Sequence, residues 1–164
     1  MSKIIHGKVL RLGDNINTDY IIPAKYLDLY EPEELGPHAF EAYGDYRDKV
    51  KGHSIIVGGE NFGLGSAREQ APNALKGAGV SAVVAKSFAR IFYRNTLNVG
   101  VVAIECPEAA GAIGSDEEVE IDLERGTIAA GKRTFHFFPF PPQVRELLEA
   151  GGMSPYLEKK LKLR

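Results

Sequence analysis

Three short apolar runs, at residues 54–57, 81–85 and 101–104, constrain the fold of this chain more than any other feature. Each run has the length of a buried strand, and the first one ends in two glycines. Helices are predicted between the runs, one beginning near Ser66 and one over 87–95. Strands that alternate with helices in this way form the βαβ units of a parallel sheet. The sequence therefore predicts an α/β core.

The segments on either side of this core predict further strands. Short alternating stretches after Pro107, separated by a glycine-containing turn, are typical of a β-meander. We therefore expect a mixed sheet flanked by helices, with weak helical character over 31–43. The length of the chain, 164 residues, suits one domain spanning 1–164. The other predicted segments are strands at 3–10, 118–123, 127–129 and 133–138, and helices at 143–150 and after 154–155.

Charge and composition exclude several classes of function. Twenty Lys and Arg residues against 22 Asp and Glu residues give a net charge of −2, so we expect neither a nucleic-acid partner nor a membrane surface. No stretch approaches the roughly 18 apolar residues of a membrane-spanning helix. The N-terminal residues have no apolar segment of the secretory type, so the expected compartment is the cytoplasm.

Metal chemistry is limited by the ligands that the chain offers. It has one cysteine, Cys106, and four histidines, none of which lie at ligand spacing. Iron–sulfur clusters are held by several thiolates and structural zinc by four ligands. We therefore predict no metal site and no cluster in this chain alone.

The most unusual segment is 58–69 (GGENFGLGSARE), which has four glycines in its first eight residues. Such a segment lets the backbone approach another group closely. It fits neither the dinucleotide fingerprint, which would need glycine at Arg68, nor the Walker loop, nor the Gly-x-Ser-x-Gly elbow.

Ser66 and Arg68 favour an anion such as a carboxylate, because a helix N-terminus attracts negative charge and arginine can bind a carboxylate through two hydrogen bonds. The alternative is purely structural: Ser66 and Glu69 have the spacing of a capping box. Pro72 fits poorly inside a helix that begins at Ser66, so that helix is either kinked or begins later.

Two motifs carry a family resemblance. The segment 61–69 (NFGLGSARE), followed by 85–95 (AKSFARIFYRN), resembles the swivel domain of the aconitase superfamily. Residues 17–27 (NTDYIIPAKYL) add to the resemblance. The chain from Gly7 to the last helix is similar, in order and size, to the free-standing small subunits of isopropylmalate isomerase and homoaconitase. The resemblance implies a swivelling β/β/α domain of the aconitase type.

This family divides its labour between two chains. The resemblance implies a separate large subunit that holds a 4Fe-4S cluster, with the present chain closing over it. The implied reaction is the reversible loss and re-addition of water on a hydroxy-diacid or hydroxy-triacid. A C–H group next to a carboxylate must then be deprotonated while hydroxide leaves. A homo-oligomer of the isolated chain is also possible.

The resemblance assigns roles to individual residues. Ser66 corresponds to the catalytic base, Arg68 to a ligand of a substrate carboxylate, and Asp19 to the aspartate that supports a catalytic histidine of the large subunit. The structural alternative for Asp19 is a turn cap. The spacing of Lys86, Arg90 and Arg94 places them near one helix face, where we interpret them as ion pairs or partner contacts.

Two departures from the family pattern bear on the substrate. Ala67 stands where many members have a second serine, so one hydroxyl contact is missing although the backbone amide remains. In the loop after Leu27, Asp28 replaces the arginine typical of homoaconitases and would repel an extra carboxylate. Leu29 and Tyr30 can pack against an isopropyl group. The loop favours isopropylmalate and leaves other substituted malates open, with Asp28 facing solvent or pairing with Lys25 as the alternative.

The sequence leaves three functions to be compared. The first is the catalytic small subunit of an isopropylmalate enzyme in leucine biosynthesis. The second is the same subunit of homoaconitase or another substituted-malate dehydratase. The third belongs to a different class, a non-catalytic carboxylate-binding module, for which Ala67 is the argument.

Overall fold

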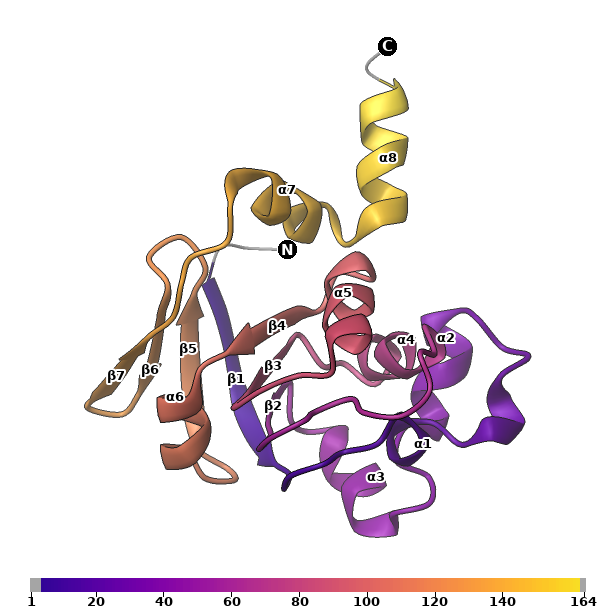
Figure 1. Cartoon of the computed structure of the whole chain (residues 1–164), viewed down its shortest axis with the longest axis horizontal. Coiled ribbons are helices and arrows are strands. Elements are labelled where there is room, and N and C mark those ends of the chain that lie inside the picture. The colour runs from indigo at the N-terminus through magenta and orange to yellow at the C-terminus, as the bar shows by residue number, and fades with distance from the viewer. Residues whose placement is uncertain (1–3, 163–164) are drawn as a thin grey trace.

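A seven-stranded sheet runs through the part of the chain that the computed structural model describes, residues 4–162 (Figure 1). The strand order is β4-β3-β2-β1-β5-β6-β7. Lys3, with which the predicted first strand begins, lies outside the described residues. The strands are β1 (Ile4–Arg11), β2 (Ile55–Val57), β3 (Ala82–Ala85), β4 (Val102–Glu105), β5 (Glu118–Asp122), β6 (Thr127–Ala130) and β7 (Arg133–His136).

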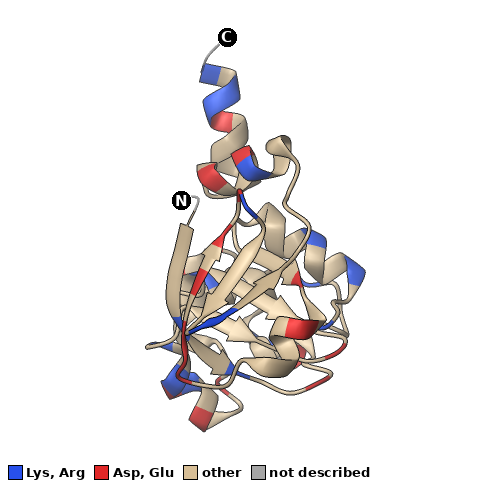
Figure 2. Ribbon diagram, turned by 90° about the vertical axis from the view of Figure 1, so that its left-hand side faces the viewer, with Lys and Arg blue, Asp and Glu red and all other residues tan. Residues whose placement is uncertain are grey.

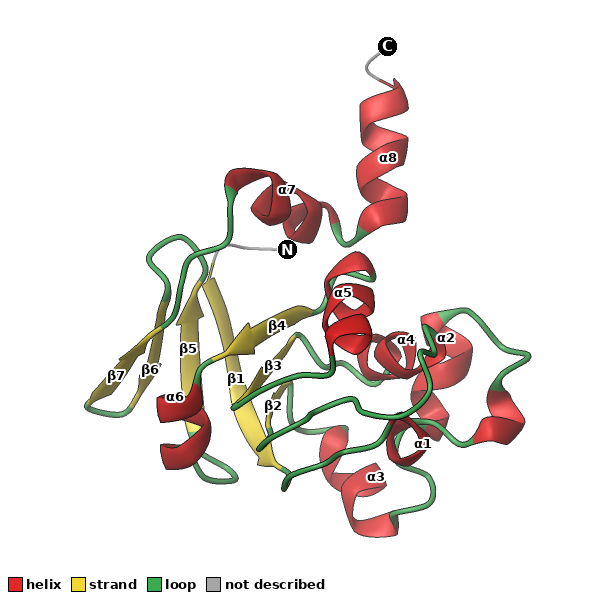
Figure 3. Cartoon of the chain, in the orientation of Figure 1, coloured by secondary structure: helices red, strands yellow, loops and turns green. Residues whose placement is uncertain are grey.

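The sheet is mixed, and β1 joins its two halves. β1, β2, β3 and β4 are parallel to one another, with Leu10 opposite Ile56 in the register of β1 and β2. On its other edge β1 pairs antiparallel with β5, which continues into the β5-β6-β7 meander. The predicted βαβ core, the meander and the mixed sheet flanked by helices are therefore confirmed (Figure 3).

Apolar residues of the central strands enter both faces of the sheet. In β2, Ile56 belongs to one hydrophobic cluster, while Ile55 and Val57 belong to a second cluster. The first cluster includes residues of α4 and α5, and the second includes residues of α6 and α7. Both faces are covered, which explains why these strands are continuously apolar. The helices are α1 (Thr18–Ile21), α2 (Pro32–Leu35), α3 (Gly44–Val50), α4 (Gln70–Gly77), α5 (Arg90–Asn98), α6 (Pro107–Ala112), α7 (Pro142–Ala150) and α8 (Met153–Lys162), with 3-10 turns at Ala24–Tyr26 and Gly36–His38.

Several helix boundaries differ from the prediction. α4 begins at Gln70, four residues after Ser66, so Pro72 lies in its first turn, where proline is tolerated. The later start is one of the two outcomes that Pro72 indicated. α5 begins at Arg90 instead of residue 87, and α8 begins at Met153. The short helices α1, α3 and α6 were not predicted.

α8 extends away from the sheet (Figure 1). None of its described side chains is buried, and its last turn carries Lys159, Lys160 and Lys162. Figure 2 shows basic residues at the projecting end of this helix. No helix among residues 4–162 is long and apolar enough to cross a membrane.

Candidate active site

Two loops lie side by side at the carboxyl ends of the neighbouring parallel strands β1 and β2. The amide of Gly63 donates to the Ile16 carbonyl at 2.7 Å, and the amide of Thr18 donates to the Leu64 carbonyl at 2.9 Å. Asn17 and Leu64 form a parallel bridge. In open α/β sheets, ligands bind at this end of the strands. The contact brings Asp19, which follows Thr18, next to the segment that contains Ser66.

Two glycines allow the second loop to lie so close to its neighbours. Gly63 has a φ of +85°, and a Cβ atom there would lie 2.1 Å from the Phe92 ring. Gly65 has a φ of +103°, and a Cβ atom there would lie 2.5 Å from Asn17 Oδ1. A side chain at either position would hold the backbone in an unfavourable conformation and would clash with the neighbouring residue. The predicted close approach of the glycine-rich segment is therefore an approach to the rest of this chain.

A third loop, after β3, supports the glycine-rich segment from the other side. The Phe62 amide donates to the Ser87 carbonyl at 3.0 Å, and the Ala89 amide donates to the Phe62 carbonyl at 3.0 Å. The rings of Phe62, Phe88 and Phe92 pack together, with centroids 5.6–6.5 Å apart. This packing explains why the two sequence motifs occur together: the second motif holds the loop of the first.

Ser66 is exposed and lies outside any helix. Its carbonyl accepts hydrogen bonds from Thr18 Oγ1 at 3.1 Å and from the Arg68 amide at 2.8 Å. The amides of Ser66 and Ala67 donate no hydrogen bond to any residue in 4–162. The N-cap of α4 is Glu69, without a side-chain bond, so the capping-box alternative for Ser66 is wrong. Ser66 is also not in the first turn of α4, where the helix dipole acts most strongly.

Arg68 and Asp19 form an ion pair, with Arg68 Nη1 2.5 Å from Asp19 Oδ1. The contact lacks hydrogen-bond geometry, and Nη1 has no other partner among the described residues. The Arg68 side chain is only 18% exposed, whereas that of Asp19 is 55% exposed. The turn is capped by Asn17, whose Oδ1 accepts from the Asp19 amide at 2.9 Å, so the alternative of Asp19 as a side-chain cap is wrong.

Asp28, Leu29 and Tyr30 follow the 3-10 turn and differ in exposure. Asp28 is exposed, and Tyr30 is 66% exposed. Leu29 is half-buried and packs against the first hydrophobic cluster. Gln70 Nε2 donates to the Leu27 carbonyl at 3.1 Å, which attaches this loop to the start of α4. Lys25 lies 3.5 Å from Glu41 in an ion pair, so the alternative in which it pairs with Asp28 is wrong.

A family model described as the aconitase C-terminal domain matches residues 5–109, which include both motifs and every candidate site residue. The chain belongs to the aconitase C-terminal domain family. The resemblance to this superfamily is thereby confirmed.

Full-length relatives and a solved structure agree with this assignment. The chain is 50% identical over 162 residues to the 3-isopropylmalate dehydratase small subunit of Moorella thermoacetica, covering 97% of this chain and 98% of the relative. It is 48% identical to the isopropylmalate/citramalate isomerase small subunit of Methanocaldococcus jannaschii, covering 98% of each chain. A crystal structure of 3-isopropylmalate dehydratase from M. jannaschii has a TM-score of 0.87 at 42% identity, covering 98% of this chain and 96% of the other. The aconitase-type fold is therefore confirmed.

Within this aconitase-type domain, the second motif is arranged differently from the prediction. Lys86 lies before α5, so it does not share a helix face with Arg90 and Arg94. No ion pair among residues 4–162 includes any of the three, which removes the ion-pair alternative within the described chain. Their role as partner contacts stays a prediction.

Sequence reasoning missed the residues that hold the site together. Thr18 is buried and ties the β1 loop to Ser66, and Gln70 ties the loop after Leu27 to α4. Polar side chains in loops carry no periodic signal. The one available signal was the position of Thr18 between Asn17 and Asp19, inside the motif that carried the resemblance.

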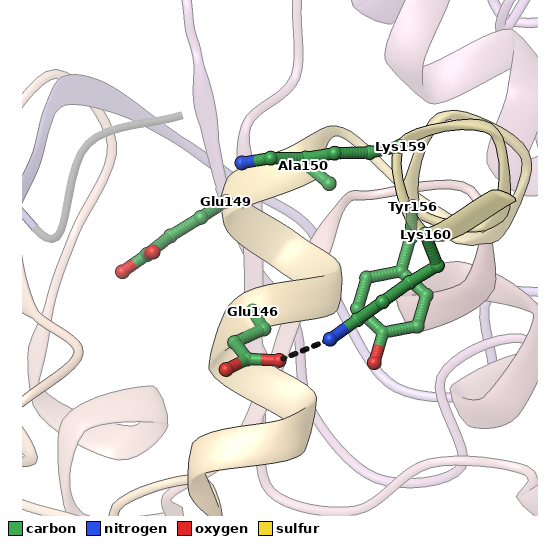
Figure 4. Close-up of a pocket in the computed structure, with 6 residues that line it drawn as sticks. All are labelled: Glu146, Glu149, Ala150, Tyr156, Lys159 and Lys160. Atoms are coloured by element: carbon green, nitrogen blue, oxygen red, sulfur yellow. Dashed lines mark ion pairs between the residues drawn. The ribbon is translucent and has the colours of Figure 1, made fainter. Parts of the chain in front are cut away.

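Two further features of residues 4–162 lie apart from the candidate site residues. No group of three or more His, Cys, Asp or Glu side chains within residues 4–162 could hold a metal ion, and Cys106 is buried. A hollow of about 350 Å³ lies between α7 and α8, where Glu146 and Lys160 pair at 3.9 Å beside Glu149 and Lys159 (Figure 4). This hollow contains none of the candidate site residues, and its charges are of both signs.

Proposed function

We propose that this chain is the small subunit of a 3-isopropylmalate dehydratase, a hydro-lyase that interconverts 2- and 3-isopropylmalate by dehydration and rehydration. The observation that carries the proposal is an exposed serine, Ser66, beside the mostly covered guanidinium group of Arg68; the amides of Ser66 and Ala67 donate to no residue in 4–162. The names of the relatives in M. thermoacetica and M. jannaschii support the choice of reaction.

Ser66 takes the proton from the substrate carbon that lies next to a carboxylate. A serine is a weak base unless its alkoxide is stabilised. The unpaired amides of Ser66 and Ala67 are the groups that can donate to developing negative charge there. Because α4 begins four residues later, this stabilisation comes from loop amides and from Arg68 more than from the helix dipole.

Arg68 binds a substrate carboxylate, and Asp19 orients the guanidinium group before substrate arrives. A carboxylate ligand replaces the close Asp19 contact or shares the guanidinium group with it. Asp19 then becomes available to a histidine of the large subunit, the role that the resemblance gives it. A half-exposed ion pair contributes about 0–1 kcal/mol, so a bound carboxylate can displace it.

The 4Fe-4S cluster does not fit the described part of this chain. Its one cysteine is buried, and no metal-binding group of side chains is present in residues 4–162. We therefore assign the cluster, and with it the departure of hydroxide, to a separate large subunit. The complex is proposed to act in the cytoplasm as one step of leucine biosynthesis, with residues 1–164 forming one domain.

Asp28 favours isopropylmalate over homoaconitate as the substrate. Its carboxylate is exposed and has no ion-pair partner within residues 4–162, so it would repel the additional carboxylate of a triacid. Leu29 and Tyr30 supply apolar surface beside it. The alternatives are the same subunit in homoaconitase or in another substituted-malate dehydratase.

Reconstitution tests this proposal. The purified chain is combined anaerobically with the cluster-bearing large subunit of the same organism, and kcat/KM is measured for isopropylmalate, citramalate and homoaconitate. We expect isopropylmalate to have the highest value. Preference for another diacid or triacid would select the corresponding dehydratase. Binding of a diacid to the chain without turnover in any complex would identify a non-catalytic carboxylate-binding module.

A further inference from the structure

A polar cluster closes the base of the segment that presents Asp28, Leu29 and Tyr30. The Tyr26 hydroxyl donates to the carboxylate of Glu41, with its oxygen 2.6 Å from Oε2 and 2.8 Å from Oε1. Tyr26 lies just before residues 28–30, and Glu41 lies after the chain has returned through α2. The contact between Tyr26 and Glu41 therefore joins the two ends of the segment 26–41.

Two further side chains converge on the same carboxylate. Lys25 Nζ lies 3.5 Å from Glu41 Oε2, and His38 Nδ1 lies 3.4 Å from Oε1. The rings of His38 and Tyr26 stack with their centroids 3.9 Å apart. Glu41 is the single carboxylate among these groups, and its side chain is only 21% exposed. It is the centre of the cluster, since all three neighbours contact it.

The backbone next to Glu41 is held in an unusual conformation. Phe40 is buried and has a φ of +58°, which is rare for a residue with a large side chain. Its amide donates to the Ile21 carbonyl at 2.8 Å, which attaches it to α1. Such strain persists only where the surrounding structure fixes the chain. The core at Phe40 therefore fixes the position from which Glu41 reaches Tyr26.

The electrostatics agree with a charged carboxylate at the centre. The hydrogen bond from Tyr26 lowers the pKa of Glu41, and the hydrogen bond from His38 and the charge of Lys25 act in the same direction, against the opposing effect of burial. The charge of Glu41 in turn raises the pKa of Lys25. At neutral pH both groups are charged, and each stabilises the other.

We propose that Glu41 is a positioning residue for substrate selection: it holds Tyr26 at the base of the loop at residues 27–30 and thereby helps to set where Asp28, Leu29 and Tyr30 lie relative to Arg68. This inference rests on the proposed function. The second attachment of the loop is the Gln70 contact with the Leu27 carbonyl, and Gln70 lies two residues after Arg68. With both attachments present, the loop and Arg68 are held in one arrangement.

The first experiment measures the loop in the full chain without substrate. Backbone amide hydrogen exchange is compared for the wild type, Glu41→Ala, Glu41→Gln and Tyr26→Phe. We expect faster exchange at the Leu29 amide, which donates to the Tyr26 carbonyl, in Glu41→Ala and Tyr26→Phe. Glu41→Gln keeps an acceptor for Tyr26 and should lie between the wild type and Glu41→Ala.

A matched control is available at the other end of β1. The Asp122 side chain is 18% exposed, accepts from the amides of Glu124 and Arg125, and lies opposite Ile4 in the sheet. Asp122→Ala therefore removes a half-buried carboxylate of similar surroundings, far along β1 from the candidate site. It should leave exchange at residues 27–30 at the wild-type rate.

The second experiment measures kinetics in the reconstituted complex. Glu41→Ala should raise KM for isopropylmalate roughly tenfold, change kcat less than about twofold, and narrow the preference for isopropylmalate over citramalate. Glu41→Gln should restore most of the lost affinity, and Asp122→Ala should match the wild type.

Both measurements must change for the inference to stand. Unchanged exchange in Glu41→Ala shows that Glu41 does not fix the loop, and unchanged KM and preference show that the fixed loop does not select substrate; either result overturns the inference. Equal effects of Asp122→Ala also overturn it. A wild-type complex that is inactive on every diacid refutes the proposed function instead, because the exchange experiment does not depend on turnover.

Discussion

The ion pair of Asp19 and Arg68 places two groups of opposite charge where the three loops meet. Asp19 is more than half exposed, so solvent screens its charge and the pair adds little to stability. Arg68 is mostly covered, and it has no hydrogen-bond partner for Nη1 among the described residues. A carboxylate that approaches from solvent must therefore displace or share the Asp19 contact to reach this nitrogen.

Ser66→Ala tests the base directly. We expect kcat in the reconstituted complex to fall by about 10²–10⁴, the usual contribution of general base catalysis. The free energy of unfolding of the chain should change by less than about 0.5 kcal/mol, because Ser66 is exposed and caps no helix. Urea titration and steady-state kinetics check both parts. Ser154→Ala, which changes an exposed serine in α8, is the control. A stable Ser66→Ala variant with wild-type kcat would contradict the role of Ser66.

Asp19→Asn removes the charge and keeps the shape of the side chain. We expect kcat to fall about 10- to 100-fold, the effect of losing a group that orients a catalytic partner. Unfolding free energy should fall by less than about 1 kcal/mol. Asp45→Asn, at an exposed carboxylate in α3, should behave like the wild type in both measurements. If Asp19→Asn retains full kcat, Asp19 serves only the ion pair.

At the scale of elements, the glycine-rich loop is shaped by contacts with neighbours distant in sequence. Gly63→Ala should lower the unfolding free energy by about 2 kcal/mol or more, because it combines a positive φ with a clash against Phe92. Gly13→Ala is the matched control, since a Cβ atom there meets nothing within 4 Å. The unfolding free energies of both variants are measured by chemical denaturation. Similar losses of unfolding free energy in the two variants would show that the loop can relax around an added methyl group.

A contact between His53, which follows α3, and Asp116, which precedes β5, predicts a pH effect. His53 Nε2 lies 2.7 Å from Asp116 Oδ1, and this hydrogen bond lowers the pKa of Asp116 below its ordinary value of 3.8. A carboxyl group with a lowered folded pKa stabilises the protein above its unfolded pKa, and this stabilisation disappears as pH falls through the folded pKa. The wild type should therefore be more stable than Asp116→Asn at pH 6, and the difference should shrink towards pH 3.

Denaturation of both proteins across this pH range provides the measurement. Asp45→Asn serves as the control, because its exposed carboxylate lies in α3 and makes no contact with His53 or Asp116. A difference between wild type and Asp116→Asn that stays constant from pH 6 to pH 3 would contradict the assignment.

The elements show how far the sequence alone could predict the fold. The strands β2, β3 and β4 were predicted to within one residue, because a strand buried on both faces leaves a continuous apolar run. The late start of α4 was one of the two outcomes that Pro72 indicated, but Ser66 and Glu69 also satisfy a local capping pattern, so the sequence left the start open. Long-range bonds to the β1 loop decide the conformation. α6 was missed because Pro107 ends a strand and also begins a helix.

For the candidate site too, the sequence could indicate some residues and not others. The motifs indicated Ser66, Arg68 and Asp19 as candidates, and the structure places Asp19 in contact with Arg68. The bond from Thr18 to the Ser66 carbonyl joins residues 48 positions apart in the sequence. The groups that hold them in place, such as Thr18 and Gln70, act through single hydrogen bonds between loops. No periodicity encodes such bonds, so sequence reasoning could not supply them.

At the scale of the whole molecule, the residues that stabilise the fold and the candidate site residues lie at different places on the sheet. Two hydrophobic clusters cover its two faces, and the candidate site lies at the edge where β1, β2 and β3 end. The site is open on this side: Ser66, Ala67 and Asp19 are exposed. A surface of this kind suits a chain that completes its active site with a partner.

The last prediction follows from this separation and concerns the isolated chain. With two buried clusters it has enough core to unfold cooperatively by itself. With one buried thiol it has too few ligands to bind a cluster. After anaerobic incubation with iron and sulfide, the chain should therefore stay colourless, retain no iron after desalting and show no dehydratase activity, while the complex with the large subunit is coloured and active. Iron analysis, visible absorbance and turnover of isopropylmalate measure these outcomes, and a coloured, active single chain would place the whole reaction within this domain and refute the division of labour.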